Sequence, residues 1–181
     1  MRKALSVTPA LIVVSGPAGA GKTTLAHSLA AAIGCPAICR DEIKEGLFAG
    51  LDVDYEAAAD DALTRRASAA FFDVVELLVG AGVTLVAEAA FQDHVWRPRL
   101  EGLLDVATAR VVRCTVDPPV GRRRMEARSH RPAHADTSVI ADRDYYDTFV
   151  PVSISAPIID VDTSDGYQPS LDRVVAFARG V

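Results

Sequence analysis

A glycine-rich octapeptide between an apolar run and a helical pattern constrains this chain more than any other feature. Residues 16–23 read GPAGAGKT and match the pattern G-x-x-x-x-G-K-[ST]. The run before them, Ala10–Ser15, is rich in β-branched residues and is typical of a strand buried on both faces. After them, Thr23–Ile33 has leucines and isoleucine at a spacing of four and predicts a helix ended by Gly34. We therefore expect a strand, a phosphate-binding loop and a helix in that order.

The residue types of this loop suit the phosphates of a nucleotide. Its glycines let successive backbone N–H groups turn inward around an anion, and the helix N-terminus adds partial positive charge. Lys22 would reach the β and γ phosphates, and the Thr23 hydroxyl is placed to ligate Mg²⁺. A plain glycine turn would explain the glycines but not the lysine and threonine. We predict ATP and Mg²⁺ as cofactors, with nucleotide contacts from Gly16, Pro17, Ala18, Gly19, Ala20, Gly21, Lys22, Thr23 and Thr24.

The pattern of the remaining segments predicts an α/β fold. Further short strands are expected at Ala37–Cys39, Val83–Ala87, Arg110–Val116 and Pro157–Val161. Helical patterns lie between them, at about Glu56–Val79, after Asp117 as a cap, and at Ser170–Arg179. Alternating strands and helices imply a parallel five-stranded sheet with helices on both faces, the P-loop NTPase fold of the nucleoside-monophosphate-kinase-like type.

The length and charge of the chain limit the kinds of function that it can have. The 181 residues, half of them hydrophobic, fit one domain over residues 1–181. A net charge of −5 predicts no general attraction to nucleic acid or to an anionic membrane. Three cysteines, an odd number, argue against a disulfide framework. No apolar run reaches membrane-spanning length, so we expect a soluble cytoplasmic protein, either a monomer or a homodimer.

Two absences favour a small kinase over other nucleotide-hydrolysing classes. The sequence contains no asparagine, so the guanine-reading element N-K-x-D of a GTPase is missing. The length is short for an oligomeric or transport ATPase module.

Four motifs together carry a resemblance to a known group. GPAGAGKTT, ICRDEIKEGL, VAEAAF and a segment ending in RPAHAD resemble the zeta-toxin and polynucleotide-kinase-like branch of AAA-type, ATP-binding P-loop kinases. Chloramphenicol phosphotransferase and gluconate kinase are related members. The similarity runs from Leu11 to about Asp162. It implies a kinase for a hydroxyl group but does not identify the acceptor.

Two carboxylates follow strands of the predicted sheet. In the resembled kinases an aspartate after the second strand orients and deprotonates the acceptor, and that position falls on Asp41. Independently, neighbouring parallel strands end at one crevice, where Asp41 would face the γ-phosphate. Its alternative role is the N-cap of the following helix. Glu88 ends the third strand, where it could hold a water of Mg²⁺ or contact the acceptor.

An arginine-rich segment at about residues 122–137 is expected to form a short lid. Five arginines fall within ten residues, and like charges at helical spacing need an anion to offset them. The triphosphate is a natural candidate. A solvated face partly paired with Glu126 is the alternative. The arginines expected to contact the phosphates are, in order of preference, Arg124, Arg128 and Arg131. Arg124 and Arg128 are also predicted to be catalytic, together with Lys22 and Asp41.

Several weaker assignments complete the predicted site. Arg40 and Lys44 would bind an anionic part of the substrate, or would be solvated helix charges. Phe91 and Trp96 would lie near the acceptor, or in the core, and Thr163 would lie near the nucleotide. We assign no histidine to catalysis.

The predicted function is transfer of the ATP γ-phosphate to a hydroxyl of a small molecule. A polynucleotide 5′-hydroxyl kinase and a nucleotide-binding regulatory or toxin-like module are the alternatives, and the acidic balance counts against the first.

Overall fold

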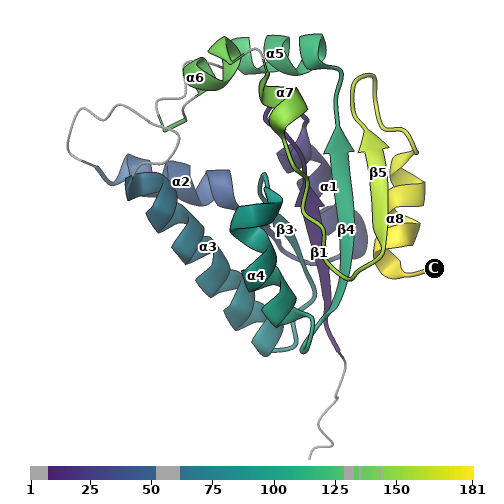
Figure 1. Cartoon of the computed structure of the whole chain (residues 1–181). Coiled ribbons are helices and arrows are strands. Elements are labelled where there is room, and N and C mark those ends of the chain that lie inside the picture. The colour runs from purple at the N-terminus through teal and green to yellow at the C-terminus, as the bar shows by residue number, and fades with distance from the viewer. Residues whose placement is uncertain (1–7, 52–61, 129–132, 135, 143) are drawn as a thin grey trace, which may run out of the picture.

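A computed structural model describes residues 8–51, 62–128, 133–134, 136–142 and 144–181 (Figure 1). Its centre is one five-stranded sheet in the order β2-β3-β1-β4-β5, with every neighbouring pair parallel. The predicted parallel sheet is confirmed. The strands are β1 Ala10–Ser15, β2 Ala37–Cys39, β3 Leu85–Glu88, β4 Thr108–Thr115 and β5 Ile158–Asp162.

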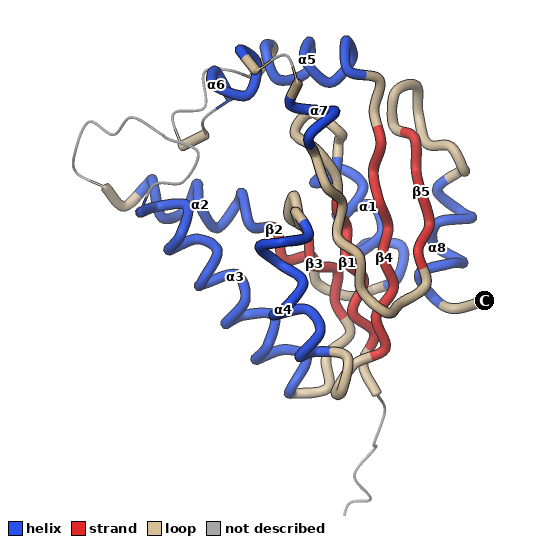
Figure 2. The backbone as a smooth tube through the Cα atoms, in the orientation of Figure 1, coloured by secondary structure: helices blue, strands red, loops and turns tan. Residues whose placement is uncertain are grey.

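Helices cover both faces of this sheet and its carboxyl edge (Figure 2). They are α1 Lys22–Ile33, α2 Arg40–Ala49, α3 Ala62–Gly80, α4 Asp93–Leu103, α5 Pro118–Glu126, α6 Asp136–Ala141, α7 Tyr145–Thr148 and α8 Leu171–Arg179. Helices α3 and α4 lie on one face, and α1 and α8 lie on the other. Helices α5, α6 and α7 lie across the end of the sheet toward which the strands point.

The central strand β1 separates two hydrophobic cores. Leu11 and Val13 pack in the core under α3 and α4, whereas Ile12 and Val14 pack in the core under α1 and α8. All four side chains are at most 1% exposed. Burying each of them stabilises the fold by about 1.5–3 kcal/mol. This two-sided burial explains why β1 is a continuous apolar run instead of an alternating one.

Element boundaries differ from the sequence expectations in a few places. The third strand begins at Leu85 instead of Val83, and it includes Glu88. Helix α3 begins at Ala62; the part of the predicted helix over residues 56–61 lies outside the described residues. Helix α5 begins after Asp117 as predicted, but the Asp117 side chain makes no capping hydrogen bond. Helices α4, α6 and α7 fall in segments with no predicted element.

The strands that carry the candidate site end at the same level. Glu88 pairs in register with Val14 on one side and with Cys39 on the other. The phosphate loop after β1 and Asp41 after β2 therefore emerge on either side of Glu88, at the carboxyl ends of the strands. The three cysteines are free, as expected. Among the described helices, none combines the length and apolar character needed to cross a bilayer.

Candidate active site

The glycine-rich loop lies too close to neighbouring backbone to carry side chains at two of its positions. Gly16 has φ 146°, and a Cβ there would lie 2.4 Å from the carbonyl oxygen of Cys114 on β4. Gly19 has φ 77°, and a Cβ there would lie 2.4 Å from the carbonyl oxygen of Gly121 on α5. Any side chain would push the loop away from both elements. The predicted loop is therefore present, with its glycines required for close packing as well as for its turn.

Two adjacent tyrosines on α7 hold the middle of the loop. The Ala18 N–H donates to the Tyr145 hydroxyl at 2.9 Å, and the Tyr146 hydroxyl donates to the Ala18 carbonyl at 3.1 Å. The two rings pack edge to face with their centroids 5.3 Å apart. Sequence reasoning missed both residues, and only their adjacency in a polar segment could have indicated them.

Arg124 and Thr163 support the loop from the side of its carbonyl groups. The Arg124 guanidinium donates to the Thr163 carbonyl at 2.7 Å and to the Gly19 carbonyl at 3.3 Å. Thr163 is 3% exposed, and its hydroxyl lies 3.0 Å from the Ala20 carbonyl and 3.1 Å from the Thr115 carbonyl. Both predicted residues therefore contact the loop backbone. Direct contact of either with a nucleotide stays a prediction.

Replacing Arg124 with alanine should loosen the loop. Hydrogen bonds from a charged donor contribute about 1.5–3 kcal/mol each, so we expect a lower thermal midpoint and an affinity for ATP reduced about tenfold or more. Isothermal titration with ATP and a thermal melt measure both quantities. Arg123→Ala, one residue earlier and exposed, is the matched control and should change neither. Equal behaviour of the two variants would contradict the supporting role of Arg124.

Lys22, Thr23 and Glu88 meet at the start of α1. The Lys22 ammonium donates to the Pro17 carbonyl at 2.9 Å. The Thr23 hydroxyl donates to Glu88 Oε2 at 3.1 Å, and Glu88 is 1% exposed. Thr24 lies exposed on the first turn of α1. The two residues predicted to organise Mg²⁺ therefore lie within hydrogen-bonding distance of each other, and their binding of the ion stays a prediction.

Burial raises the pKa of the Glu88 carboxyl, and the nearby Asp41 carboxylate raises it further. The Lys22 charge and the Thr23 hydrogen bond act in the opposite direction, but the net pKa stays above its usual range. A hydroxyl and a carboxylate oxygen are the hard donors that Mg²⁺ prefers, and a cation would offset this buried charge. These residues therefore fit the predicted metal site.

Replacing Glu88 with glutamine should stabilise the nucleotide-free protein and impair its Mg²⁺-dependent binding of ATP. A carboxyl group whose pKa is raised by folding lowers the free energy of unfolding once the group is ionised. This cost is absent below the ordinary pKa and grows as pH rises toward and through the raised pKa. We expect the free energy of unfolding of Glu88→Gln to exceed that of the wild type by on the order of 1 kcal/mol near neutral pH. No difference is expected at low pH, where Glu88 is protonated in both the folded and the unfolded protein. Thermal melts over a pH series measure this difference.

Glu101→Gln, at an exposed position on α4, is the control for the Glu88 series. Glu88→Gln should also weaken the dependence of ATP binding on Mg²⁺. A Glu88→Gln protein that is less stable than the wild type at neutral pH would contradict the cost assigned to the buried charge.

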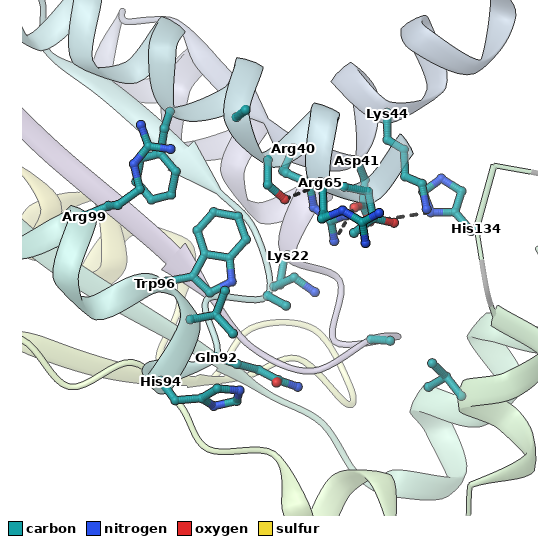
Figure 3. A pocket seen from close by; sticks show the side chains of 18 of the residues that line it. Lys22, Arg40, Asp41, Lys44, Arg65, Gln92, His94, Trp96, Arg99 and His134 are labelled. Carbon is teal, nitrogen blue, oxygen red and sulfur yellow. Dashed lines mark hydrogen bonds and ion pairs between the residues drawn. The ribbon is translucent and has the colours of Figure 1, made fainter. Parts of the chain in front are cut away.

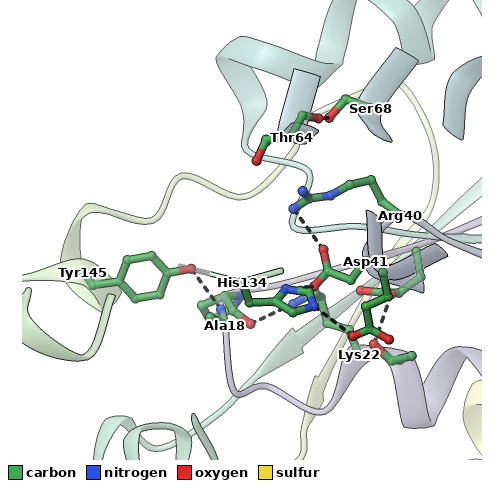
Figure 4. A network of polar contacts seen from close by, with 12 residues as sticks. Ala18, Lys22, Arg40, Asp41, Thr64, Ser68, His134 and Tyr145 are labelled. Atoms are coloured by element: carbon green, nitrogen blue, oxygen red, sulfur yellow. Dashed lines mark hydrogen bonds and ion pairs between the residues drawn. The ribbon is translucent and has the colours of Figure 1, made fainter. Parts of the chain in front are cut away.

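Asp41 lies on the first turn of α2 among cationic groups (Figure 4). Arg40 Nη2 is 3.1 Å from Asp41 Oδ1, and His134 Nδ1 is 3.9 Å from Asp41 Oδ2. His134 Nε2 also lies 2.8 Å from Glu45. Because α2 begins at Arg40 with Cys39 as its N-cap, the alternative role of Asp41 as the N-cap is wrong. His134 joins this cluster, although no histidine was assigned a catalytic role.

Burial acts to raise the pKa of Asp41, but the surrounding cations outweigh it and the pKa is lowered. Arg40 makes the largest contribution to this lowering, followed by Lys22, His134 and Arg128. The Asp41 carboxylate is therefore ionised at neutral pH, and its side chain is 37% exposed. An ionised, accessible carboxylate can accept a proton or a hydrogen bond from a hydroxyl group.

A cavity of about 720 Å³ joins these groups (Figure 3). Of the predicted site residues, it is lined by Ala18, Lys22, Arg40, Asp41, Lys44 and Arg128. Further lining comes from Arg65, Ser68 and Phe72 on α3 and from Gln92, His94, Trp96 and Arg99 at α4. The volume is in the range of small-molecule sites. Arg65, Ser68 and Phe72 share one face of α3, and this spacing was the available signal for them.

The prediction that Phe91 binds substrate is wrong. Phe91 is 0% exposed, and its ring packs against Phe71 and Trp96 with centroids 5.9 and 5.0 Å apart. The chain turns at Phe91, with φ 49°, so that its ring enters the core instead of the cavity. Trp96 belongs both to the core, where it is 7% exposed, and to the wall of the cavity.

The predicted lid is described only in part. Its first residues belong to α5, which packs on the loop through Gly121. Arg131 lies outside the described residues, and its phosphate contact stays a prediction.

Comparisons with known proteins agree with this geometry. A family model described as AAA domain matches residues 11–146. Among curated proteins, none matches the sequence. A crystal structure from Chloroflexus aurantiacus, provisionally assigned as a kinase, aligns with a TM-score of 0.81 at 24% identity, covering 96% of this chain and 98% of that one.

Two liganded structures are also similar. Kti12 of Chaetomium thermophilum, in complex with ADP-AlF3, aligns with a TM-score of 0.67 at 17% identity, covering 94% and 97% of the two chains. The APS kinase CysC of Mycobacterium tuberculosis, in complex with AMPPNP and APS, aligns with a TM-score of 0.60 at 16% identity, covering 96% of both. At these identities the likeness shows the fold. Because the family model spans well over half of its residues, the chain belongs to the AAA domain family and has the fold of a small P-loop kinase.

Proposed function

We propose that this chain is an ATP-dependent kinase that transfers the γ-phosphate to a hydroxyl group of a small molecule. The observation that carries the proposal is that Lys22 of the phosphate loop and the ionised Asp41 line the same cavity. A triphosphate bound by the loop would lie at the wall that Ala18 and Lys22 form, and the rest of the cavity would receive the small molecule.

In the proposed reaction Asp41 accepts a hydrogen bond from the acceptor hydroxyl and aligns its oxygen with the γ-phosphorus. The oxygen forms a new bond to phosphorus, its proton passes to the Asp41 carboxylate, and the bond to the bridging oxygen of ADP breaks. Lys22 and Arg128, which both line the cavity, offset negative charge on the transferring group.

The metal and the lid complete the proposed machinery. Thr23 and Glu88 would hold Mg²⁺, directly and through a bound water, and the ion would neutralise phosphate charge. The single domain 1–181 would close a lid at about 122–137 over the nucleotide, with Arg124, Arg128 and Arg131 at or near the phosphates. Closure would exclude water and limit hydrolysis of ATP without an acceptor.

Transfer of radiolabelled phosphate from ATP tests the proposal. The purified protein would be incubated with Mg-ATP and a panel of alcohols, and labelled products would be separated from ATP. We expect at least one alcohol to be phosphorylated in a Mg²⁺-dependent reaction that Lys22→Ala abolishes. Tight binding of ATP with no labelled product from any alcohol would count against a small-molecule kinase and favour a nucleotide-binding module.

A further inference from the structure

We propose that His27, Cys39 and Glu42 form a binding site for a transition-metal dication of the zinc class, separate from the predicted Mg²⁺ site. The three residues come from three successive elements, since His27 lies in α1, Cys39 ends β2 and Glu42 lies in the first turn of α2. None of them is among the described residues that line the cavity. The site is thus a second one, and its existence does not depend on the proposed kinase function.

The donor atoms of the three side chains lie close together. His27 Nε2 is 2.7 Å from Glu42 Oε1 and 3.8 Å from Cys39 Sγ, and all three atoms lie within 4.8 Å of one another. With zinc bonds of about 2.0–2.3 Å, the ligand atoms of a tetrahedral site lie about 3.3–3.6 Å apart. The observed spacings bracket this range. Small rotations of the His27 and Glu42 side chains would therefore let an ion take the place of their hydrogen bond.

The kinds of donor select the kind of ion. A thiolate and an imidazole favour zinc over magnesium, which prefers oxygen ligands. The predicted Mg²⁺ site, in contrast, offers oxygen atoms of Thr23 and Glu88. Three protein ligands leave the fourth tetrahedral position to a water molecule.

The site is open to solvent on one side. The side chains of His27 and Glu42 are 51% and 46% exposed, whereas Cys39 is buried. Cys39 packs in the core under α1 and α8, on the face of the sheet opposite to α3 and α4. An ion can therefore enter between the two exposed ligands, with the sulfur as the inner wall of the site.

Formation of the thiolate has a cost that the ion must offset. Burial raises the pKa of the Cys39 thiol, and the Glu88 and Glu42 carboxylates raise it further. The thiol is therefore protonated in the metal-free protein at neutral pH, and binding of the ion displaces this proton to the solvent. The carboxylates that favour the proton on sulfur also attract a dication.

A bound ion would link α1 to the start of α2. Helix α1 begins at Lys22, directly after the phosphate loop, and the first turn of α2 carries Asp41. Coordination by His27 and Glu42 would hold these two helix starts together. Because an ion that binds only the folded chain stabilises it, Zn²⁺ should raise the thermal midpoint in the absence of nucleotide.

Titration of the metal-free full chain with Zn²⁺ alone, and with Co²⁺ as a spectroscopic probe, tests the proposal. No nucleotide is added, and an excess of Mg²⁺ occupies sites that consist of oxygen donors. We expect a single Zn²⁺ ion to bind per chain and to raise the thermal midpoint. Co²⁺ should give a thiolate-to-metal charge-transfer band and the visible bands of tetrahedral coordination.

Substitutions of the sulfur and nitrogen ligands have matched controls in the chain. Cys39→Ser should remove the charge-transfer band, and His27→Gln should weaken Zn²⁺ binding by about tenfold or more. Cys35→Ser and His94→Gln remove a thiol and an imidazole outside the three-residue group and should change neither property. His27 is exposed, so His27→Gln tests the site even if the buried Cys39→Ser variant fails to fold.

Two carboxylate variants separate this site from the predicted Mg²⁺ site. Glu42→Gln should weaken Zn²⁺ binding as His27→Gln does, whereas in zinc-free Mg-ATP assays it removes no metal ligand. Glu88→Gln should keep the charge-transfer band of Co²⁺. Loss of that band in Glu88→Gln would assign the ion to the Mg²⁺ site and overturn the proposal.

Three further results would overturn it. The first is the absence of Zn²⁺ binding in the presence of Mg²⁺. The second is a charge-transfer band that persists in folded Cys39→Ser. The third is a Zn²⁺ affinity of His27→Gln that equals that of His94→Gln.

Discussion

Replacing Lys22 with alanine is expected to abolish phosphoryl transfer, lowering kcat/KM by about 10³-fold or more. Lys22 lies at the first position of α1, directly after the glycine loop, and its ammonium contacts the Pro17 carbonyl. It lines the cavity, and its positive charge lowers the pKa of the Asp41 carboxyl and opposes the rise in the pKa of the Glu88 carboxyl. Alanine removes the cation that offsets charge on the β and γ phosphates, so binding and transfer should both suffer.

Steady-state kinetics and titration with ATP would measure the two effects separately. We expect Lys22→Arg to restore little activity, because a planar guanidinium does not replace a compact ammonium in a closely packed loop. A thermal melt checks that the variants are folded. The loop keeps its glycine contacts in both variants, so the melting temperature should change little. Retention of more than one-tenth of wild-type turnover by Lys22→Ala would contradict the assignment of this lysine.

Much of the fold could be predicted because its signals are local. The run Ala10–Ser15 is apolar throughout since β1 is buried on both faces, and its predicted limits match the observed strand. The phosphate loop follows from eight contiguous residues, and Asp41 and Glu88 follow from the rule that parallel strands end at one edge. Helix α4 was harder to predict, because Pro98 lies inside it and its hydrophobic face is short.

The walls of the cavity depend on contacts between segments far apart in sequence. His134 meets Glu45 across 89 residues and Tyr145 meets Ala18 across 127, and no local pattern encodes such pairs. At Phe91 a local pattern was present, but it predicted the wrong surroundings. Its position after the third strand suggested the cavity, but a positive φ directs the ring into an aromatic cluster in the core. Backbone turns of this kind are decided by packing.

Replacing Asp41 with asparagine is expected to lower kcat by roughly 10²-fold or more while ATP still binds. Asparagine keeps the shape and one oxygen of the side chain, but it cannot take the proton of the acceptor hydroxyl. It also leaves Arg40 and His134 without the carboxylate that lies between them, so the melting temperature should fall by a few degrees. Glu42→Gln, the adjacent carboxylate outside the cavity lining, is the matched control.

The pH profile gives a second test of Asp41. Because its pKa is lowered, the carboxylate stays ionised as pH falls until the pH is below the ordinary range of about 4 for aspartate. Its share of the stability and of the activity is therefore present above the ordinary pKa of aspartate and is lost as pH falls through the lowered pKa. In the wild type, protonation of Asp41 should not limit kcat between about pH 5 and pH 8.

A base held at a low pKa is a weak one, so orientation of the hydroxyl should supply part of its effect. Asp41→Glu keeps the charge but moves it by about one methylene, and it should also lose most of the turnover. If the Asn variant instead kept full kcat and raised only the KM of the acceptor, Asp41 would be a binding residue. The proton would then leave the hydroxyl by another route.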